Sequence, residues 1–368
     1  MDRGGLAPSP FFSGVSMIKK NHVLSNLRID EGFDLAPAEK DIGFTHIELS
    51  PDVLSNLESG DEIPGFRPLR DIVPFTKGRA VEWKLKDHVM SAKARNWPMH
   101  KPFEFHNQSI CICGGGPSLG PNLDKLRSLQ KSGAKVMAIN RTGDYLLGLP
   151  KSHGMPWIKP WACILLESIP NAANYIAPRN GIRYYIGSQC HPDTFDKFEP
   201  YEHFIWHAQS HKIVEDCLTD QERKHMVPSV GSTCGLRAII FAYMLGFKKI
   251  HLFGFDSCYN DEEIKNGICG LDGAPRLHSY EKKETIHDIK ELVVRGFDSG
   301  RDRQYWGNGN MLAQADEFQR FIKWRNNNIT QGRMDNHDII VHGFGLIPDI
   351  ARQYGLHSES KQNERKAA

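Results

Sequence analysis

The chain has 368 residues, enough for one large domain with extensions or for two modest domains. Hydrophobic residues make up 40% and charged residues 24%, as in ordinary globular proteins, and a formal net charge of +2 favours no strongly charged partner. No apolar run approaches the roughly 20 residues that cross a bilayer, and the N-terminus lacks a signal peptide's apolar core. These features predict a cytoplasmic protein without a membrane segment.

The eight cysteines form no C-x-x-C pair, so no structural zinc site is expected. Several of them stand in apolar runs, where a free cysteine behaves as a small hydrophobe. We therefore expect buried, reduced thiols.

Residues 1–104 are predicted to be an N-terminal extension, because prolines break the first part and no strong periodicity appears there. Between residues 67 and 101 the composition becomes basic. Four apolar residues of this segment recur at helical spacing: Val81, Leu85, Val89 and Ala92. This spacing predicts an amphipathic helix whose positive face either is simply solvated or binds an anion such as DNA.

From residue 109 onward, short apolar runs alternate with helical patterns. The predicted strands are 109–113, 135–139, 161–166, 183–186, 203–206, 250–253 and 338–341. The predicted helices are 123–132, 235–245, 282–294 and 313–326. Continuous apolar strands between helices are typical of a mostly parallel sheet covered on both faces. The sequence thus predicts an α/β fold, a Rossmann-like doubly wound domain over 105–355, with a disordered tail at 356–368.

A glycine turn follows the first of these strands. Its residues are Gly114, Gly115, Gly116, Pro117, Ser118 and Leu119. Glycines allow a close approach of backbone N–H groups to a phosphate, and the following helix start adds a partial positive charge. The turn is neither a complete G-x-G-x-x-G fingerprint nor a P-loop, since Leu119 replaces the last glycine and no Gly-Lys-Ser/Thr follows. A nucleotide site is favoured over a purely structural turn.

Polar residues at other strand ends complete the predicted nucleotide site. Asn140 follows the second strand and is either a ligand of a base or ribose or a turn residue. Gln189 follows the fourth strand and can reach the same edge. Ser232, Thr233 and Gly235 open an apolar helix and offer a second place where N–H and hydroxyl groups meet an anion.

The strand at 250–253 leads into Gly-Phe-Asp, and we expect Asp256 to be the functional carboxylate, with turn capping as its structural alternative. His278 is the predicted proton acceptor, because the pKa of histidine lies near neutrality. Tyr259 stands in the loop after the aspartate, and 305–310 is predicted to be an exposed loop with aromatic residues that stack on a base or sugar.

This ordered set of motifs resembles the MptE-like family. The set consists of the turn ending Gly-Pro-Ser-Leu, then Asn140, then 231–235, then 245–250 leading into Gly254-Phe255-Asp256. Members of the family are 6-hydroxymethylpterin diphosphokinases and flagellin-glycosylation accessory proteins. The run 188–192 makes the chain similar to the phage-encoded branch, which would imply the host cytoplasm as its location.

The same motif order is similar to bacterial lipooligosaccharide sialyltransferases. The resemblance implies that Asn140, Ser232 or Thr233, and Tyr259 touch a nucleotide. Gly115 stands where those enzymes have an asparagine, and 308–310 lacks their catalytic histidine. For the diphosphokinases the resemblance implies Mg²⁺, for which Glu167, Asp256 and Asp261 are the candidate ligands.

Three functions follow as hypotheses. The first is a glycosyltransferase-like enzyme that uses a nucleotide or nucleotide-sugar donor and a hydroxyl acceptor, either a small molecule or a modified base of DNA. The second is a Mg²⁺-dependent diphosphokinase that converts ATP to AMP. The third is a catalytically silent nucleotide-binding protein that assists assembly.

Overall fold

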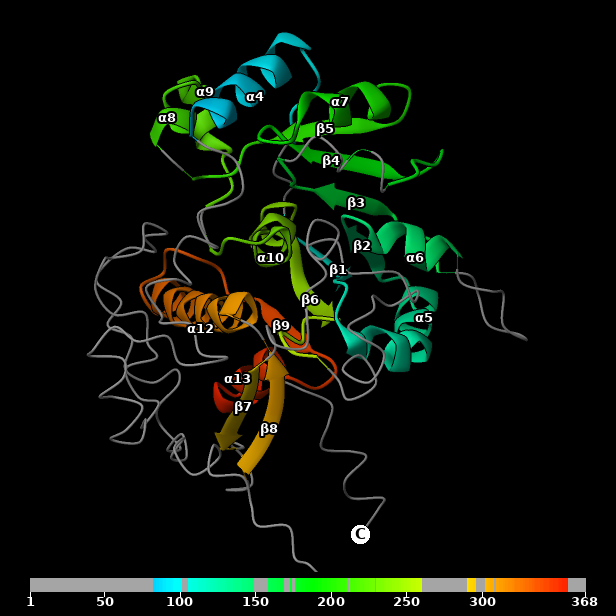
Figure 1. The fold of residues 1–368 in the computed structure, drawn as a ribbon, viewed down its shortest axis with the longest axis vertical. Coiled ribbons are helices and arrows are strands. Elements are labelled where there is room, and N and C mark those ends of the chain that lie inside the picture. The colour runs from blue at the N-terminus through cyan, green and yellow to red at the C-terminus, as the bar shows by residue number, and fades with distance from the viewer. Residues whose placement is uncertain are drawn as a thin grey trace, which may run out of the picture.

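The computed structural model describes residues 82–100, 105–148, 158–168, 173, 176–210, 212–228, 230–259, 290–295, 302–307 and 309–356. At the centre of this part of the chain is a sheet of seven parallel strands in the order β5-β4-β3-β2-β1-β6-β9 (Figure 1). The strands are β1 His106–Cys113, β2 Lys135–Ile139, β3 Ala162–Leu165, β4 Arg183–Gly187, β5 His203–Trp206, β6 Phe247–Phe253 and β9 Asp338–Val341.

Both faces of the sheet are buried, because alternate side chains of each strand point to opposite sides. On β1, Ile110 and Ile112 belong to one core, whereas Cys111 and Cys113 belong to the other. Such strands need apolar residues at every position, which is why they read as continuous hydrophobic runs. The predicted doubly wound α/β fold is confirmed.

Two sets of helices cover the two faces (Figure 1). The first core is closed by α10 Cys234–Met244, α12 Gly309–Thr330 and α13 Leu346–Gln353. The second is closed by α5 Leu123–Lys131, α6 Thr142–Gly148 and α7 Pro192–Phe198. The second half of the glycine turn belongs to a 3₁₀ helix, Pro117–Asn122, which leads into α5. The sequence had predicted that the turn is followed by an α-helix alone.

The helix predicted around Leu85 and Val89 is α4, Glu82–Ala94. Its apolar side chains pack against α8, Lys212–Glu215, which is followed by α9, Asp220–Lys224. These three helices lie together next to the β5 edge of the sheet (Figure 1). Beyond α4 the chain pairs with β5, since Met99 forms a parallel bridge with Ile205.

Two sequence predictions were wrong. The helix at 282–294 is contradicted in its described part, because Lys290–Arg295 is a strand, β7. The loop at 305–310 is instead the end of β8, Asp302–Gly307, and the start of α12. The two strands pair in antiparallel register, and this pairing satisfies their backbone hydrogen bonds, which outweighs the weak helical pattern of a valine-containing segment.

The cysteine prediction is confirmed for the described residues. Six of the seven described cysteines are buried and all seven are free. Burial raises the pKa of the Cys190 thiol to about 12, so this side chain stays a neutral thiol in the core.

The order of the strands creates a switch point between β1 and β6. From β1 the chain moves outward through β2 to β5, then returns to place β6 on the other side of β1. In open α/β sheets ligands bind outside the carboxyl ends of strands at such a point. The glycine turn after β1 and the Gly-Phe-Asp segment after β6 both lie there.

Candidate functional site

The glycine turn is pressed against the end of β6. The N–H of Gly114 donates to the carbonyl of Phe253 at 2.8 Å, and that of Gly116 donates to the carbonyl of Gly254 at 2.9 Å. A β-carbon on Gly114 would lie 2.7 Å from the Gly254 oxygen, and one on Gly116 would lie 2.6 Å from Asp256 Oδ2. No side chain fits at these distances, so the close approach of two backbones requires these two glycines.

Asp256 accepts two hydrogen bonds from Ser118 of this turn. Its Oδ2 accepts the backbone N–H of Ser118 at 2.6 Å, and its Oδ1 accepts the Ser118 hydroxyl at 2.5 Å. The carboxylate is only 1% exposed. The Asp256 carboxylate therefore occupies the position where a phosphate was predicted to bind.

Gly115 is the part of the turn that faces outward. It is exposed, and a β-carbon there would meet only Thr142 Oγ1, at 3.8 Å. Gly114, Gly116, Ser118 and Leu119 all use their N–H groups within the chain. Among the N–H groups of 114–119, that of Gly115 makes no hydrogen bond in the described part of the chain, so it is the donor left for a ligand.

Asn140 lies at the end of the neighbouring strand, β2. It adopts a left-handed conformation with φ 46°, which asparagine tolerates better than most residues. Its side-chain oxygen accepts the N–H of Leu166 at 3.2 Å and thus ties β2 to the end of β3. The amide nitrogen has no acceptor among the described residues, so Asn140 combines a structural bond with a donor at the sheet edge.

The start of α10 forms the second half of the site. The N–H and hydroxyl groups of Ser232 both donate to Glu317 Oε2, at 3.0 and 2.9 Å, and Thr233 caps the helix by accepting the N–H of Leu236 at 3.2 Å. Glu317 comes from α12 and is buried, and desolvation raises its pKa. As at Ser118, a carboxylate of the chain binds the predicted anion donors.

Phe255 lies between the two halves. A β-carbon on Gly235, in the first turn of α10, would come within 3.2 Å of the Phe255 ring, and one on Gly114 within 3.5 Å. The Phe255 ring therefore contacts both the glycine turn and the helix start. The structure thus brings together two groups of residues that are far apart in the sequence.

Other predicted site residues are engaged elsewhere. Gln189 donates to the Ala208 carbonyl at 2.9 Å and to Ser210 Oγ at 2.8 Å, so its amide points toward the chain after β5. Tyr259 is 2% exposed. Glu167 is half-buried at the end of β3. The nucleotide contacts predicted for Gln189 and Tyr259 and the magnesium contact predicted for Glu167 stay predictions.

His278 and Asp261 lie outside the described residues. Within those residues, no three histidine, cysteine, aspartate or glutamate side chains gather as a metal site would require. Asp256, the shared member of the proposed magnesium set, already has both oxygens bound to Ser118. The described residues therefore do not fit the proposed magnesium site.

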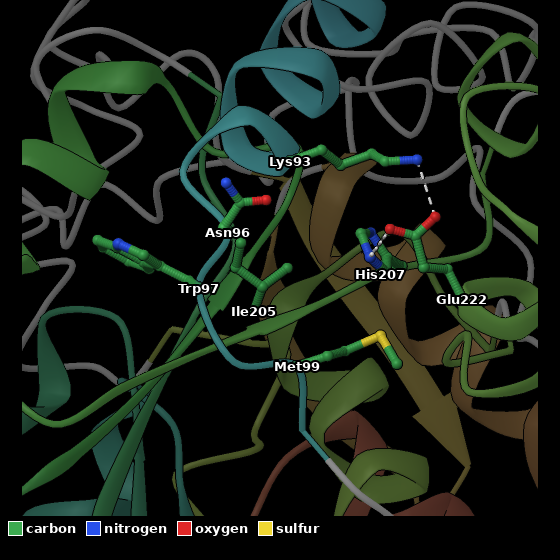
Figure 2. Close-up of a pocket in the computed structure, with 7 residues that line it drawn as sticks. All are labelled: Lys93, Asn96, Trp97, Met99, Ile205, His207 and Glu222. Atoms are coloured by element: carbon green, nitrogen blue, oxygen red, sulfur yellow. Dashed lines mark hydrogen bonds and ion pairs between the residues drawn. The ribbon is translucent and has the colours of Figure 1, made fainter.

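A pocket lies away from the glycine turn, at the β5 edge (Figure 2). It encloses about 280 Å³ and is lined by Lys93, Asn96, Trp97, Met99, Ile205, His207 and Glu222. His207 Nδ1 lies 2.9 Å from Ser188 Oγ, and burial lowers the His207 pKa to about 4. Lys93 donates to Glu222 at 2.8 Å (Figure 2).

That ion pair bears on the basic segment at 67–101. Its described cations include Lys93, paired with Glu222, and Arg95, paired with Asp196 at 2.6 Å. These two charges belong to contacts within the domain, which favours the structural interpretation over an anion-binding face. The remaining basic residues before 82 lie outside the described residues.

Sequence reasoning missed Glu317 and overlooked His207. Glu317 stands in a predicted amphipathic helix, and its partner Ser232 is 85 residues away, so no local pattern reveals the pair. His207 directly follows a predicted strand in the same way as Asn140, and this position was the available signal.

The fold and the strand-end residues define a Rossmann-like α/β domain. Its switch point lies at the carboxyl edge of the sheet, where ligands bind in such folds. Residues 90–262 match the family described as 6-hydroxymethylpterin diphosphokinase MptE-like, so this part of the chain is similar to that family. The match supports a transferase-type fold. The match begins within α4 and so includes the end of the segment predicted to be an extension.

The chain also resembles the solved structure of the MAf glycosyltransferase from Magnetospirillum magneticum AMB-1. The TM-score is 0.46 at 15% identity, and the alignment covers 80% of this chain and 42% of the glycosyltransferase. The chain thus spans less than half the length of that protein. No curated protein matches it in sequence. No helix within the described ranges has the length and apolar character needed to cross a membrane.

Proposed function

We propose that this chain is a nucleotide-dependent group transferase of the glycosyltransferase type, which binds a nucleotide-sugar at the edge formed by β1, β2 and α10. The observation that carries the proposal is the outward-facing Gly115 with its available N–H, at the same edge of the sheet as the side-chain amide of Asn140. A phosphate at Gly115 and a ribose or base at Asn140 match the donor groups that these two residues offer.

The count of backbone donors favours a sugar nucleotide over a triphosphate. A P-loop cradles its phosphates with several N–H groups and a lysine, whereas this turn offers the N–H of Gly115. Its other N–H groups bind Phe253, Gly254, Gly116 and Asp256. One short anionic linkage, as in a nucleoside monophosphate sugar, suits this supply better than the chain of charges on ATP.

The first turn of α10 can stabilise the leaving nucleotide. N–H groups at a helix start have no partner within the helix, and the helix dipole adds partial positive charge there. Charge that develops on a leaving phosphate next to Cys234 and Gly235 would be stabilised without reorganisation. Glu317 keeps Ser232 oriented but also places a negative group nearby, which limits how much further anionic charge the site accepts.

The two predicted catalytic residues receive different assignments. Asp256 is tied to Ser118 through both oxygens, so we assign it the positioning of the glycine turn and propose that another group takes the proton from the acceptor hydroxyl. His278 stays the predicted base. The family description favours a diphosphokinase as second candidate, for which we derive no magnesium-dependent step because Asp256 is engaged.

The test compares ligand binding by the wild type and Gly115→Asp. A thermal-shift screen followed by calorimetry would use CMP, CMP-sugars, UDP-sugars, CTP and ATP, since a ligand raises the melting temperature by mass action. The new carboxylate fits the space at Gly115 but repels a phosphate, so affinity should fall roughly 10-fold or more. The matched control is Gly148→Asp, because a β-carbon there meets no atom within 4 Å.

Unchanged affinity in Gly115→Asp would show that the nucleotide binds elsewhere. Turnover then separates the two candidate reactions. A glycosyltransferase releases a nucleotide from a sugar donor, whereas a diphosphokinase forms AMP from ATP and stops when Mg²⁺ is chelated. Formation of AMP from ATP without consumption of any sugar nucleotide would reverse the order of the two candidates.

A further inference from the structure

An exposed phenylalanine stands next to the glycine turn, in the connection between β9 and α13. Phe344 is 39% exposed, and the glycines on both sides of it have left-handed φ angles of 109° at Gly343 and 122° at Gly345. Three large hydrophobic residues are exposed within the described part of the chain: Met90, Phe105 and Phe344. Of these, Phe344 is at the carboxyl edge of the sheet, at the switch point.

The backbone on each side of Phe344 is fixed to the turn. A β-carbon on Gly343 would overlap the Ser118 hydroxyl, and one on Gly345 would overlap the Asp256 carbonyl oxygen. The N–H of Leu346 donates to that same carbonyl oxygen at 2.9 Å. Phe344 is thus held at a set position beside the Ser118–Asp256 pair while its ring stays open to ligands.

Phe105 is an exposed ring that has partners within the chain. It precedes β1, and Lys248 Nζ lies 4.4 Å from its ring centre while the Tyr243 ring lies 5.2 Å away. In the described part of the chain Phe344 has no aromatic or cationic partner of this kind. A single exposed hydrophobic residue is common on protein surfaces, so the position of Phe344 carries the argument: an aromatic ring beside the glycine turn, with its backbone fixed on both sides, can pack on a ring of a ligand bound there.

We propose that Phe344 is a stacking platform for the flat face of a ring in the ligand bound at the glycine turn. This inference rests on the proposed function. It adds Phe344, from the connection after β9, to the residues proposed to bind the nucleotide-sugar or its acceptor. The ring is either the base of the nucleotide or the pyranose of a small sugar that supplies the acceptor hydroxyl, because both present an apolar face that packs on an aromatic side chain. If the acceptor ring stacks on Phe344, the ribose or base stays at Asn140. If the base stacks on Phe344, Asn140 instead faces the donor sugar on the other side of the phosphate.

Ligand binding by the wild type, Phe344→Ala and Phe344→Trp distinguishes the nucleotide base from the acceptor pyranose as the stacked ring. One arm compares CMP, UMP, AMP and GMP with ribose 5-phosphate, which has the phosphate but no base. The other arm measures methyl galactoside and methyl glucoside by saturation-transfer NMR in the presence of CMP. Phe105→Ala is the control for loss of an exposed phenylalanine away from the site.

If a base stacks on Phe344, Phe344→Ala should weaken nucleotide binding roughly 5- to 100-fold, and Phe344→Trp should preserve it. Ribose 5-phosphate should then bind equally to all variants. If the acceptor ring stacks there, nucleotide affinity stays constant and the glycoside signals disappear in Phe344→Ala alone. Each of these results supports the platform and identifies the ring.

Nucleotide and glycoside binding that is equal in the wild type and Phe344→Ala would overturn the inference and leave the proposed function standing. An equal loss in Phe105→Ala would also overturn it, because the effect would then be general. If the wild type binds none of the nucleotides, the proposed function fails, and the glycoside arm repeated without CMP decides the inference: a signal lost in Phe344→Ala supports it, and no signal overturns it.

Discussion

At the scale of single residues, the three consecutive glycines serve different purposes. Gly114 and Gly116 face the backbone of β6's end at distances that leave no room for a side chain, whereas Gly115 faces outward. A sequence pattern cannot separate these cases, because all three glycines read alike. The distinction is nevertheless sharp enough to measure.

We expect Gly116→Ala to lower the free energy of unfolding by about 3 kcal/mol, the upper range for forcing atoms into a packed site. Gly115→Ala should change it by less than about 0.5 kcal/mol, since the new methyl group meets only Thr142. Urea denaturation of the two variants checks this contrast. Equal stability of both would mean that the turn and β6 do not approach as closely as described.

At the scale of elements, the start of α10 depends on two different kinds of bond. Thr233 caps its own helix, and Ser232 ties the helix to α12 through Glu317. The first bond follows from local sequence, because threonine at this position is a common cap. The second bond depends on the tertiary fold, since the partners lie on different helices.

Thr233→Ala should cost about 1 kcal/mol of unfolding free energy, as for other lost caps. Glu317→Ala should cost about 2–3 kcal/mol, because it leaves the Ser232 N–H and hydroxyl groups without their acceptor. Glu317→Gln is the matched control, since its side-chain oxygen still accepts from Ser232. Chemical denaturation measures all three, and a Glu317→Gln loss as large as that of Glu317→Ala would show that the charge rather than the hydrogen bonds matters.

At the scale of the whole molecule, buried histidines link stability to pH. Burial lowers the pKa of His100, His207 and His337 from the ordinary value of 6.5 to about 4. The unfolded chain therefore binds more protons than the folded chain between pH 6.5 and 4, and stability falls as the pH falls through that range. Asp316 opposes this trend, because burial raises its pKa to about 6.

Each of the three histidines should contribute up to about 3 kcal/mol to the loss of stability on acidification from pH 6.5 to 4. His207→Gln should reduce the loss of stability between pH 6.5 and 4 by the contribution of one histidine, since glutamine can still bond Ser188 but takes up no proton. Unfolding free energies measured by urea titration at several pH values test this. A variant with the same slope as the wild type would show that His207 does not stay neutral in the fold.

The sequence by itself determined all seven strands of the sheet, but of the described helices it predicted α4, α5, α10 and α12 and missed α6, α7, α8, α9 and α13. Strands buried on both faces must be apolar throughout, and runs such as 135–139 and 203–206 show this without any tertiary information. The order of glycine turn, Asn140 and helix start also followed from the sequence, because residues after parallel strands must collect at one edge. The strand β7 was missed, because a short segment of mixed polarity has no clear pattern of its own. Its pairing with β8 makes it a strand.

Only the tertiary structure decided what occupies the predicted anion sites. Asp256 reaches Ser118 across 138 residues of sequence, and Glu317 reaches Ser232 across 85. A carboxylate satisfies backbone N–H and hydroxyl donors as well as a phosphate does, so the same local motif can bind a ligand or bind the protein itself. Contact between distant segments settles that choice, and it leaves Gly115 as the outward-facing part of the glycine turn.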